Sequence, residues 1–201
     1  LMAGPEQRDR KGIRAVAVSG SRHEGGKTET ILKQWLRRLS DVGVAGELIA
    51  FHWKTIFPCV ACGNCWDLKK PICSLDDDFE ELFRKVREAD FVLLGAPGSG
   101  HGFSTGFQVF LKRARRVACA GGDCLSGKLC VIICSDPHSS RSAGFDMMLS
   151  WAYGLGMILV GYTPNEDVIE RSRFWKEERG GHSVLLDRRV ERLIEIGDRL
   201  F

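Results

Sequence analysis

Short apolar segments alternate along the chain with segments in which apolar residues recur every three or four positions. The first pattern is typical of strands buried on both faces, and the second is typical of amphipathic helices. Their alternation predicts an α/β fold, a doubly wound parallel sheet of about five strands covered by helices on both sides. The expected strands are residues 13–19, 45–51, 91–96, 128–134 and 157–160, and the expected helices are residues 28–40, 79–86, 107–114, 145–152 and 190–200.

Length and composition fit one domain of this kind. The chain has 201 residues, of which 44% are hydrophobic and 27% are charged. These values lie near the average for soluble globular proteins and argue against a disordered or fibrous chain. Because the sequence contains no internal repeat and no low-complexity linker, we expect a flexible tail at residues 1–12 and a single domain over residues 13–201.

Charge and the length of the apolar runs exclude two classes of partner. The 29 Lys and Arg residues nearly balance the 26 Asp and Glu residues, which leaves a net charge of +3. This charge is too small for a protein that binds nucleic acid electrostatically. The apolar runs are too short to cross a bilayer, and no segment resembles a signal peptide. We therefore expect a cytoplasmic protein without membrane contact, in which disulfide bonds are disfavoured.

Four of the eight cysteines form a compact motif. Cys59, Cys62, Cys65 and Cys73 have the spacing C-x2-C-x2-C-x7-C within a loop at about residues 57–75. Three thiolates two residues apart fit three corners of a cubane iron–sulfur cluster, and a fourth cysteine completes it. The spacing predicts a [4Fe–4S] centre. A structural zinc ion is the competing interpretation, although zinc sites of four cysteines usually consist of two more widely separated C-x2-C pairs.

The other four cysteines carry no such spacing. Cys130 and Cys134 fall on one face of an apolar strand, as small buried thiols do. Cys119 and Cys124 are expected in a Gly-rich loop. We expect all four to be ordinary buried or loop thiols.

Aromatic and basic residues near the motif have two interpretations each. Trp53, Phe57 and Trp66 flank the cysteines, where they either limit the access of water or belong to the core. The basic stripe at residues 112–116 (KRARR) is expected to be a solvated helix face, with the docking of an acidic electron carrier as the alternative.

The loop after the first expected strand carries groups that suit a phosphate. Residues 19–28 (SGSRHEGGKT) supply hydroxyl groups, cations and backbone N–H groups at the start of a helix. This combination attracts a dianion to the positive end of the helix dipole. The segment misses the Walker pattern by one residue and contains no G-x-G-x-x-G. The alternative is an ordinary glycine-containing turn in which Thr28 caps the helix.

The phosphate loop, the C-x2-C-x2-C motif and a strand that ends in Ala-Pro before a Gly-rich loop together resemble the iron–sulfur flavoproteins. These proteins are a branch of the NAD(P)H-dependent FMN reductase-like family. The resemblance covers residue 13 to about residue 161 and is strongest over residues 76–113. It implies a flavodoxin-like fold, FMN held at three loops, and a [4Fe–4S] cluster close to the flavin of a neighbouring subunit in a homodimer or homotetramer.

The resemblance also implies which residues hold FMN. Ser21, Arg22, His23, Lys27 and Thr28 would hold the phosphate, Pro97, Gly98, Ser99, Gly100, His101, Gly102 and Phe103 would line the isoalloxazine, and Ser135 would approach its other edge. The chain departs from the family at all three loops. In the first, Gly20-Ser21 is followed by Arg22-His23, where the family commonly reads G-S-P-R. Ser99 stands where the family usually has an aromatic residue, and residues 135–141 (SDPHSSR) replace a Gly-rich loop.

The function implied by the resemblance is electron transfer by a flavin-dependent oxidoreductase. FMN exchanges one or two electrons and a cluster exchanges one, so the pair connects a donor such as NAD(P)H or a ferredoxin to a ferredoxin-like or quinone-like acceptor. No side chain is expected to act as a catalytic acid or base. One alternative is an NAD(P)H-dependent flavin or quinone reductase with structural cysteines. Another is a cluster-bearing binding or assembly module that has lost its flavin.

Overall fold

The computed structural model describes residues 12–67, 72–97, 103–122, 124–134 and 143–163. All five expected strands and four of the five expected helices are present. The fifth helix, and the expected tail apart from Gly12, lie outside the described residues. The elements are β1 (Arg14–Ser19), α1 (Lys27–Asp41), β2 (Ala45–Ala50), the 3-10 helix η1 (Asn64–Trp66), α2 (Phe79–Glu88), β3 (Phe91–Ala96), α3 (Thr105–Ala120), β4 (Leu129–Cys134), α4 (Ala143–Tyr153) and β5 (Ile158–Thr163).

The strands form one parallel sheet in the order β2-β1-β3-β4-β5. This is the order of flavodoxin-like folds, and it confirms the predicted doubly wound topology. Ala17 at the centre of β1 lies level with Leu48 of β2 and with Leu93 of β3. The strand order reverses between β1 and β3, so a ligand crevice is expected beyond the carboxyl ends of these two strands.

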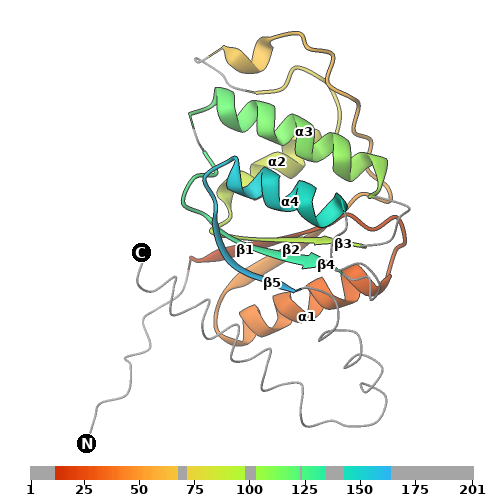
Figure 1. Ribbon diagram of the computed structural model, residues 1–201, viewed down its shortest axis with the longest axis vertical. Helices are drawn as coiled ribbons and strands as arrows, with labels where there is room; N and C mark the ends of the chain where they lie inside the picture. Colours follow the sequence, from red (N-terminus) through yellow and green to blue (C-terminus); the bar gives the residue numbers. More distant parts are fainter. Residues whose placement is uncertain (1–11, 68–71, 98–102, 123, 135–142, 164–201) are drawn as a thin grey trace, which may run out of the picture.

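Helices cover both faces of the sheet (Figure 1). On one face lies α1, and on the other lie α2, α3 and α4. The side chains of β1 alternate between the two faces: Ala15 and Ala17 pack with α1, whereas Val16 and Val18 pack in the core between the sheet and α2, α3 and α4. This alternation follows from the two-residue period of a strand, and it explains why the strands are apolar throughout.

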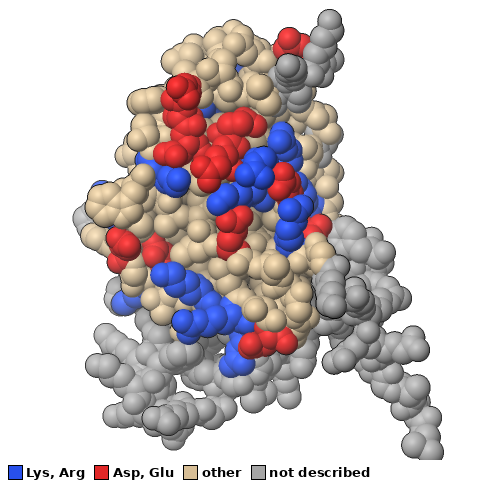
Figure 2. Space-filling model, turned by 180° about the vertical axis from the view of Figure 1, so that it is seen from behind, with Lys and Arg blue, Asp and Glu red and all other residues tan. Residues whose placement is uncertain are grey.

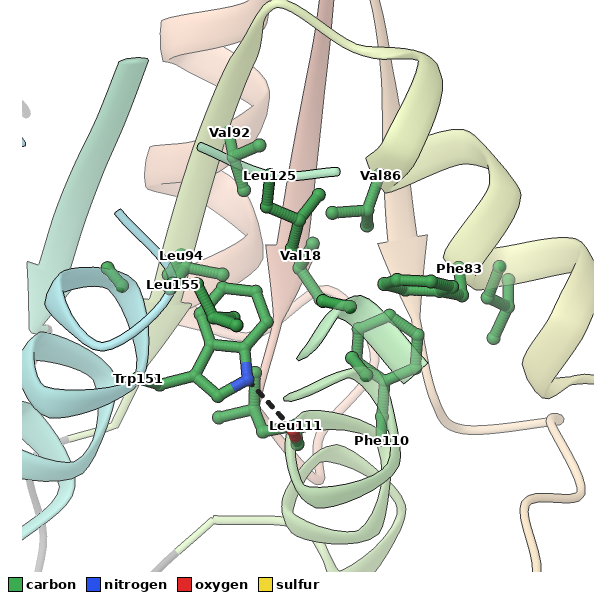
Figure 3. Close-up of a cluster of buried hydrophobic side chains, with 14 of the residues drawn as sticks. Val18, Phe83, Val86, Val92, Leu94, Phe110, Leu111, Leu125, Trp151 and Leu155 are labelled. Atoms are coloured by element: carbon green, nitrogen blue, oxygen red, sulfur yellow. Dashed lines mark hydrogen bonds between the residues drawn. The ribbon is translucent and has the colours of Figure 1, made fainter. Parts of the chain in front are cut away.

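The core between the sheet and α2, α3 and α4 is rich in large side chains (Figure 3). Phe83 of α2, Phe110 of α3 and Trp151 of α4 converge there with Leu94 of β3. The indole N–H of Trp151 donates a hydrogen bond of 2.8 Å to the carbonyl of Leu111, so the ring is buried without an unpaired polar atom. Each such side chain contributes about 1.5–3 kcal/mol by leaving water.

Two glycines bring the backbone close to its neighbours at the switch point between β1 and β3. A Cβ at Gly20 would lie 2.8 Å from Phe107, and one at Gly95 would lie 2.7 Å from Leu32. The two glycines are joined by a hydrogen bond of 2.7 Å from the Gly20 N–H to the Gly95 carbonyl. The loops that follow β1 and β3 are therefore held against one another.

Acidic and basic side chains are intermingled on the face of the molecule that Figure 2 shows. Exposed ion pairs include Lys85 of α2, which contacts Glu47 of β2 at 2.8 Å and Glu81 at 3.6 Å. Exposed pairs of this kind contribute at most about 1 kcal/mol. Within the described residues, no helix is both long enough and apolar enough to cross a membrane.

Candidate functional site

The cysteine loop lies on the outer side of the helical layer. The chain leaves β2, passes over α3 with η1 packed against that helix, and then enters α2. In Figure 1 η1 lies on the side of α3 that is turned away from the sheet. The cysteines are therefore separated from the crevice between β1 and β3 by a layer of helix.

The structure brings Cys59, Cys62, Cys65 and Cys73 together around one pocket. The pocket encloses about 280 Å³ not filled by protein atoms, part of it open to solvent. Cys65 is buried, Cys73 is partly buried, and Cys59 and Cys62 are exposed. The other lining residues are Val60, Gly63, Ser74, Leu75 and Arg116.

Two residues with left-handed backbone shape this loop. Gly63 precedes η1 with φ of +83°, and its carbonyl accepts a 2.8 Å hydrogen bond from the Trp66 N–H. Ala61 has φ of +54°, the only positive φ outside glycine among the described residues. A side chain in this conformation costs about 1–2 kcal/mol. The strain is stored between Cys59 and Cys62, and such strain is concentrated at functional sites.

Hydrogen-bond donors reach three of the four sulfurs. The Ala61 N–H lies 3.4 Å from Cys59 Sγ, and Ser74 Oγ lies 3.3 Å from Cys62 Sγ. Arg113 Nη2 donates to Cys73 Sγ at 3.0 Å. The bond with Ser74, a backbone N–H at Asn64 and the charge of Arg116 lower the pKa of Cys62 below its usual value. At Cys62 these contacts favour the thiolate, which is the form that binds metal.

The pocket does not have the arrangement of a single-ion site. Among the described residues, no three His, Cys, Asp or Glu side chains are placed to hold one metal ion. Four thiolates around one zinc ion, each bonded at about 2.3 Å, stand about 3.8 Å apart. In a cubane cluster each thiolate binds a different iron, which requires a wider arrangement. Four cysteine thiols around one pocket are a donor set that suits a [4Fe–4S] cluster, and the same set is also used by structural zinc sites.

The basic stripe on α3 is divided between solvent and interior. Lys112 and Arg115 are exposed, as expected of a solvated face. Arg113 is only 1% exposed, so the prediction is wrong at that position. Helical spacing indicates that Arg113 faces inward, because it follows Phe110 by three residues and precedes Val117 by four, and both belong to the core.

Asp77 is the buried partner of Arg113. Its carboxylate forms an ion pair with Arg113 and accepts the N–H groups of Phe57 at 2.8 Å and Phe79 at 3.1 Å. Burial alone would raise the pKa of Asp77, but the hydrogen bonds and the charge of Arg113 hold this pKa below its usual value. The two residues are 36 positions apart, so nothing local in the sequence pairs them.

Aromatic residues around the cysteine loop are exposed. Trp53 is 85% exposed, and Phe57 and Trp66 are about half exposed, so the interpretation of these residues as core is wrong. Val60 and Ile72 add apolar surface to the same loop. Exposed apolar side chains gathered on one loop are typical of an interaction surface.

The remaining cysteines have structural surroundings. Cys130 and Cys134 are buried in β4, as expected. Burial raises the pKa of Cys130 to about 12. Cys124 is partly buried, whereas Cys119 is exposed and belongs to the last turn of α3 instead of to a loop.

The loop after β1 forms a tight turn at the start of α1. Ser21 is buried, and its hydroxyl accepts from the His23 N–H and donates to the His23 carbonyl, both at 3.1 Å. α1 begins at Lys27 after Gly26, which provides no side-chain cap. Thr28 lies within the first turn, so the interpretation of Thr28 as a cap is wrong. The side chains of Arg22 and Lys27 are exposed beside this turn.

A buried carboxylate that the sequence analysis missed supports this turn. Glu29 is 2% exposed, accepts the Gly25 N–H at 3.0 Å and pairs with His52, which follows β2. Burial alone would raise the pKa of Glu29, but the contacts with His52 and Gly25 and the charge of Lys33 lower it. No spacing in the sequence connects Glu29 with His52.

Only the two ends of the second loop are described. Pro97 is partly buried, and Phe103 is buried with its ring edge-on to Phe107 at a centroid distance of 5.1 Å. The Ser104 N–H donates to the Gly20 carbonyl at 3.0 Å, which ties this loop to the loop after β1. The other residues expected at the ring lie outside the described residues: Gly98, Ser99, Gly100, His101, Gly102 and Ser135.

Comparison with known proteins gives a family match and several relatives. The sequence model of a family described as NADPH-dependent FMN reductase matches residues 13–165. The chain is 29% identical over 103 residues to an iron–sulfur flavoprotein of Methanocaldococcus jannaschii, a match that covers 51% of this chain and 52% of the relative. The chain spans about half the length of the curated relatives it matches.

Solved structures show the same fold. RosB with bound 8-demethyl-8-formylriboflavin-5'-phosphate superposes with a TM-score of 0.63 at 15% identity, over 90% of this chain and 76% of RosB. A flavodoxin from the domain Archaea superposes with a TM-score of 0.53 at 12% identity, over 94% of this chain and 99% of the flavodoxin. At these identities the likeness confirms the predicted flavodoxin-like fold alone.

Proposed function

Because this chain belongs to the NADPH-dependent FMN reductase family, we propose that it is an oxidoreductase in which FMN exchanges electrons with a [4Fe–4S] cluster. The convergence of Cys59, Cys62, Cys65 and Cys73 on one pocket carries this proposal. Hydrogen bonds to three of the sulfurs support it further, because such bonds stabilise thiolate ligands and tune the potential of a cluster.

In this proposal FMN lies beyond the carboxyl ends of β1 and β3. Ser21, Arg22, His23, Lys27 and Thr28 hold its phosphate at the start of α1, where the helix dipole and two exposed cations favour a dianion. Residues 97–103 and Ser135 line the ring. Glu29 and His52 support the turn from beneath through the Gly25 N–H.

The chain's own residues bind and position the cofactors. FMN, when bound, supplies two-electron exchange with a hydride donor such as NAD(P)H, and the cluster supplies one-electron exchange with a ferredoxin-like or quinone-like partner. Gly20 and Gly95 at the switch point leave room for Phe107 and Leu32, which holds the loops after β1 and β3 in place. The turn at Ala61 and Gly63 shapes the loop that brings the cysteines to the pocket. No side-chain acid or base is required.

We place the cluster of one subunit near the flavin of another. The cysteine loop lies on the outer side of α3, away from the crevice of its own chain, and it carries the exposed side chains of Phe57, Val60, Trp66 and Ile72. A homodimer or homotetramer would cover this apolar surface. Sedimentation of the intact protein tests the assembly, and a monomer would contradict it.

Anaerobic purification followed by iron, sulfide and flavin analysis tests the proposed cofactors. We expect about four irons, about four sulfides and one FMN per chain. Addition of NADPH or NADH without oxygen should then bleach the flavin absorbance. One zinc ion per chain without sulfide or flavin would overturn the proposal.

A further inference from the structure

One buried guanidinium joins the two ends of the cysteine loop. Arg113 Nη1 donates to the carbonyl of Phe57 at 3.0 Å, two residues before the first cysteine. Arg113 Nη2 donates to Cys73 Sγ, the last cysteine, at 3.0 Å. Arg113 projects from the middle of α3, which anchors it in the main core. A single side chain therefore closes the loop at its entry and its exit.

Asp77 and Phe79 hold this guanidinium in one orientation. Nη2 donates to Asp77 Oδ1 at 3.1 Å and Nη1 donates to Asp77 Oδ2, so the ion pair is bidentate. The ring of Phe79 lies beneath the guanidinium, with Cζ 4.1 Å from the ring centroid. Only Nε lacks a hydrogen-bond partner among the described residues. This planar fork fixes the direction of the N–H group that points at the sulfur.

Arg113 and Asp77 are the buried charges beside Cys73. The carboxylate of Glu80, which accepts the Cys73 N–H at 3.4 Å, and Arg116, which lines the pocket, are the other charged groups that the described residues place there. Asp77 and Arg113 are both buried, so solvent and salt screen them weakly. A cluster that accepts one electron gains one negative charge. An N–H donor and a cation beside a ligand sulfur stabilise the reduced form more than the oxidised form, and Asp77 acts in the opposite direction.

We propose that Arg113 is a positioning residue that holds Cys73 toward the pocket and raises the reduction potential of the cluster bound there, and that Asp77 lowers this potential. This inference rests on the proposed function. Loss of Arg113 should lower the reduction potential and loss of Asp77 should raise it, although the two residues form one ion pair. A purely structural role would not predict shifts of opposite sign.

An anaerobic redox titration of the cluster-loaded protein tests the inference. Dithionite supplies one electron per cluster, and absorbance and electron paramagnetic resonance follow its reduction. We expect Asp77→Asn to shift the potential upward, because it removes a negative charge, and Arg113→Gln to shift it downward. The double variant Arg113→Gln with Asp77→Asn should fall between Arg113→Gln and wild type, because it keeps the net charge but loses the hydrogen bond to Cys73.

The matched control is Arg115→Gln, which removes one exposed positive charge from the same helix. Its potential should equal that of the wild type. If Arg113→Gln fails to fold by circular dichroism, the upward shift of Asp77→Asn decides the question. Equal potentials in wild type and Asp77→Asn overturn this inference but leave the proposed function intact. A wild-type protein that assembles no cluster overturns both the proposed function and this inference.

Discussion

Two groups of cysteines in one chain occupy opposite surroundings. Cys62, in the loop, is exposed and has a lowered pKa because Ser74, a backbone N–H and Arg116 favour its thiolate. Cys130, in β4, is fully buried, and its pKa is raised to about 12. The same side chain is an exposed, readily ionised thiol in one place and a small apolar group in the other. Surroundings, and not the number of cysteines, decide which of them carry chemistry.

Loss of a loop cysteine should produce the largest difference between the two groups. Cys62→Ala removes one of the four proposed ligands, so we expect iron to fall from about four atoms to below about one per chain. Cys134→Ala, in β4, should keep the full iron content. Iron and sulfide assays on anaerobically purified protein compare the two variants, and equal losses would remove the distinction between the groups.

Alkylation of the metal-free, folded protein should separate the thiols by reactivity. At pH 8 we expect iodoacetamide to modify Cys62 at least about 100-fold faster than Cys130, because only the exposed thiol is accessible and readily ionised. Peptide mass spectrometry gives the two rates. In urea the rates should converge, and a fast reaction of Cys130 in the folded protein would contradict its burial.

The ion pair beneath the cysteine loop should matter for stability even without a cluster. Asp77→Ala leaves Arg113 buried and unpaired, and we expect it to lower the free energy of unfolding by about 3–5 kcal/mol. Urea denaturation of the metal-free protein measures this loss. The control Asp78→Ala removes a more exposed carboxylate that binds Lys54 and the Thr55 N–H, and its loss should be smaller.

Acid should weaken the ion pair between Asp77 and Arg113 beneath the cysteine loop. The pKa of Asp77 in the folded protein is below its usual value, so its stabilising contribution is present above about pH 4 and is lost as the pH falls through the folded pKa. The difference in unfolding free energy between wild type and Asp77→Asn should therefore narrow from pH 6 toward pH 2. A constant difference over this range would exclude the charge of Asp77 as its cause.

The smallest expected effect concerns the buried thiols themselves. Cys130→Ala removes one sulfur from a packed strand, and we expect a loss of about 1 kcal/mol from transfer and cavity terms together. Cys119→Ala, on the exposed face of α3, should change stability by less than about 0.5 kcal/mol. Thermal unfolding compares the two, and a larger loss at Cys119 would show a contact beyond ordinary exposure.

Periodicity predicted the five strands, four of the helices and a doubly wound parallel sheet, because buried parallel strands and amphipathic helices have distinct repeats. The flavodoxin-like fold was implied by the resemblance to the family. Helical periodicity also indicates that Arg113 faces inward. The interpretation of residues 112–116 as one charged stripe overlooked this. Arg113 is buried because Asp77, a sulfur and an aromatic ring compensate its charge.

The spacing of the cysteines predicted a shared site, but not what surrounds it. Asp77 and Arg113 form an ion pair although they are 36 positions apart in the sequence, and Glu29 and His52 pair although they are 23 positions apart. Such pairs depend on how helices pack on the sheet, which local sequence does not encode. The exposure of Trp53 likewise depends on where the chain leaves β2, beside Glu24 of the loop after β1, to which its indole N–H donates at 3.3 Å.

The central claim is that Cys59, Cys62, Cys65 and Cys73 hold one [4Fe–4S] cluster. Mössbauer spectroscopy of the anaerobic protein assembled with 57Fe tests it most directly, because it counts every iron by type. The account predicts that nearly all the iron belongs to one [4Fe–4S] species, and that this species disappears in Cys62→Ala but not in Cys134→Ala. Iron bound as single ions, or a cluster that survives the loss of Cys62, would contradict it.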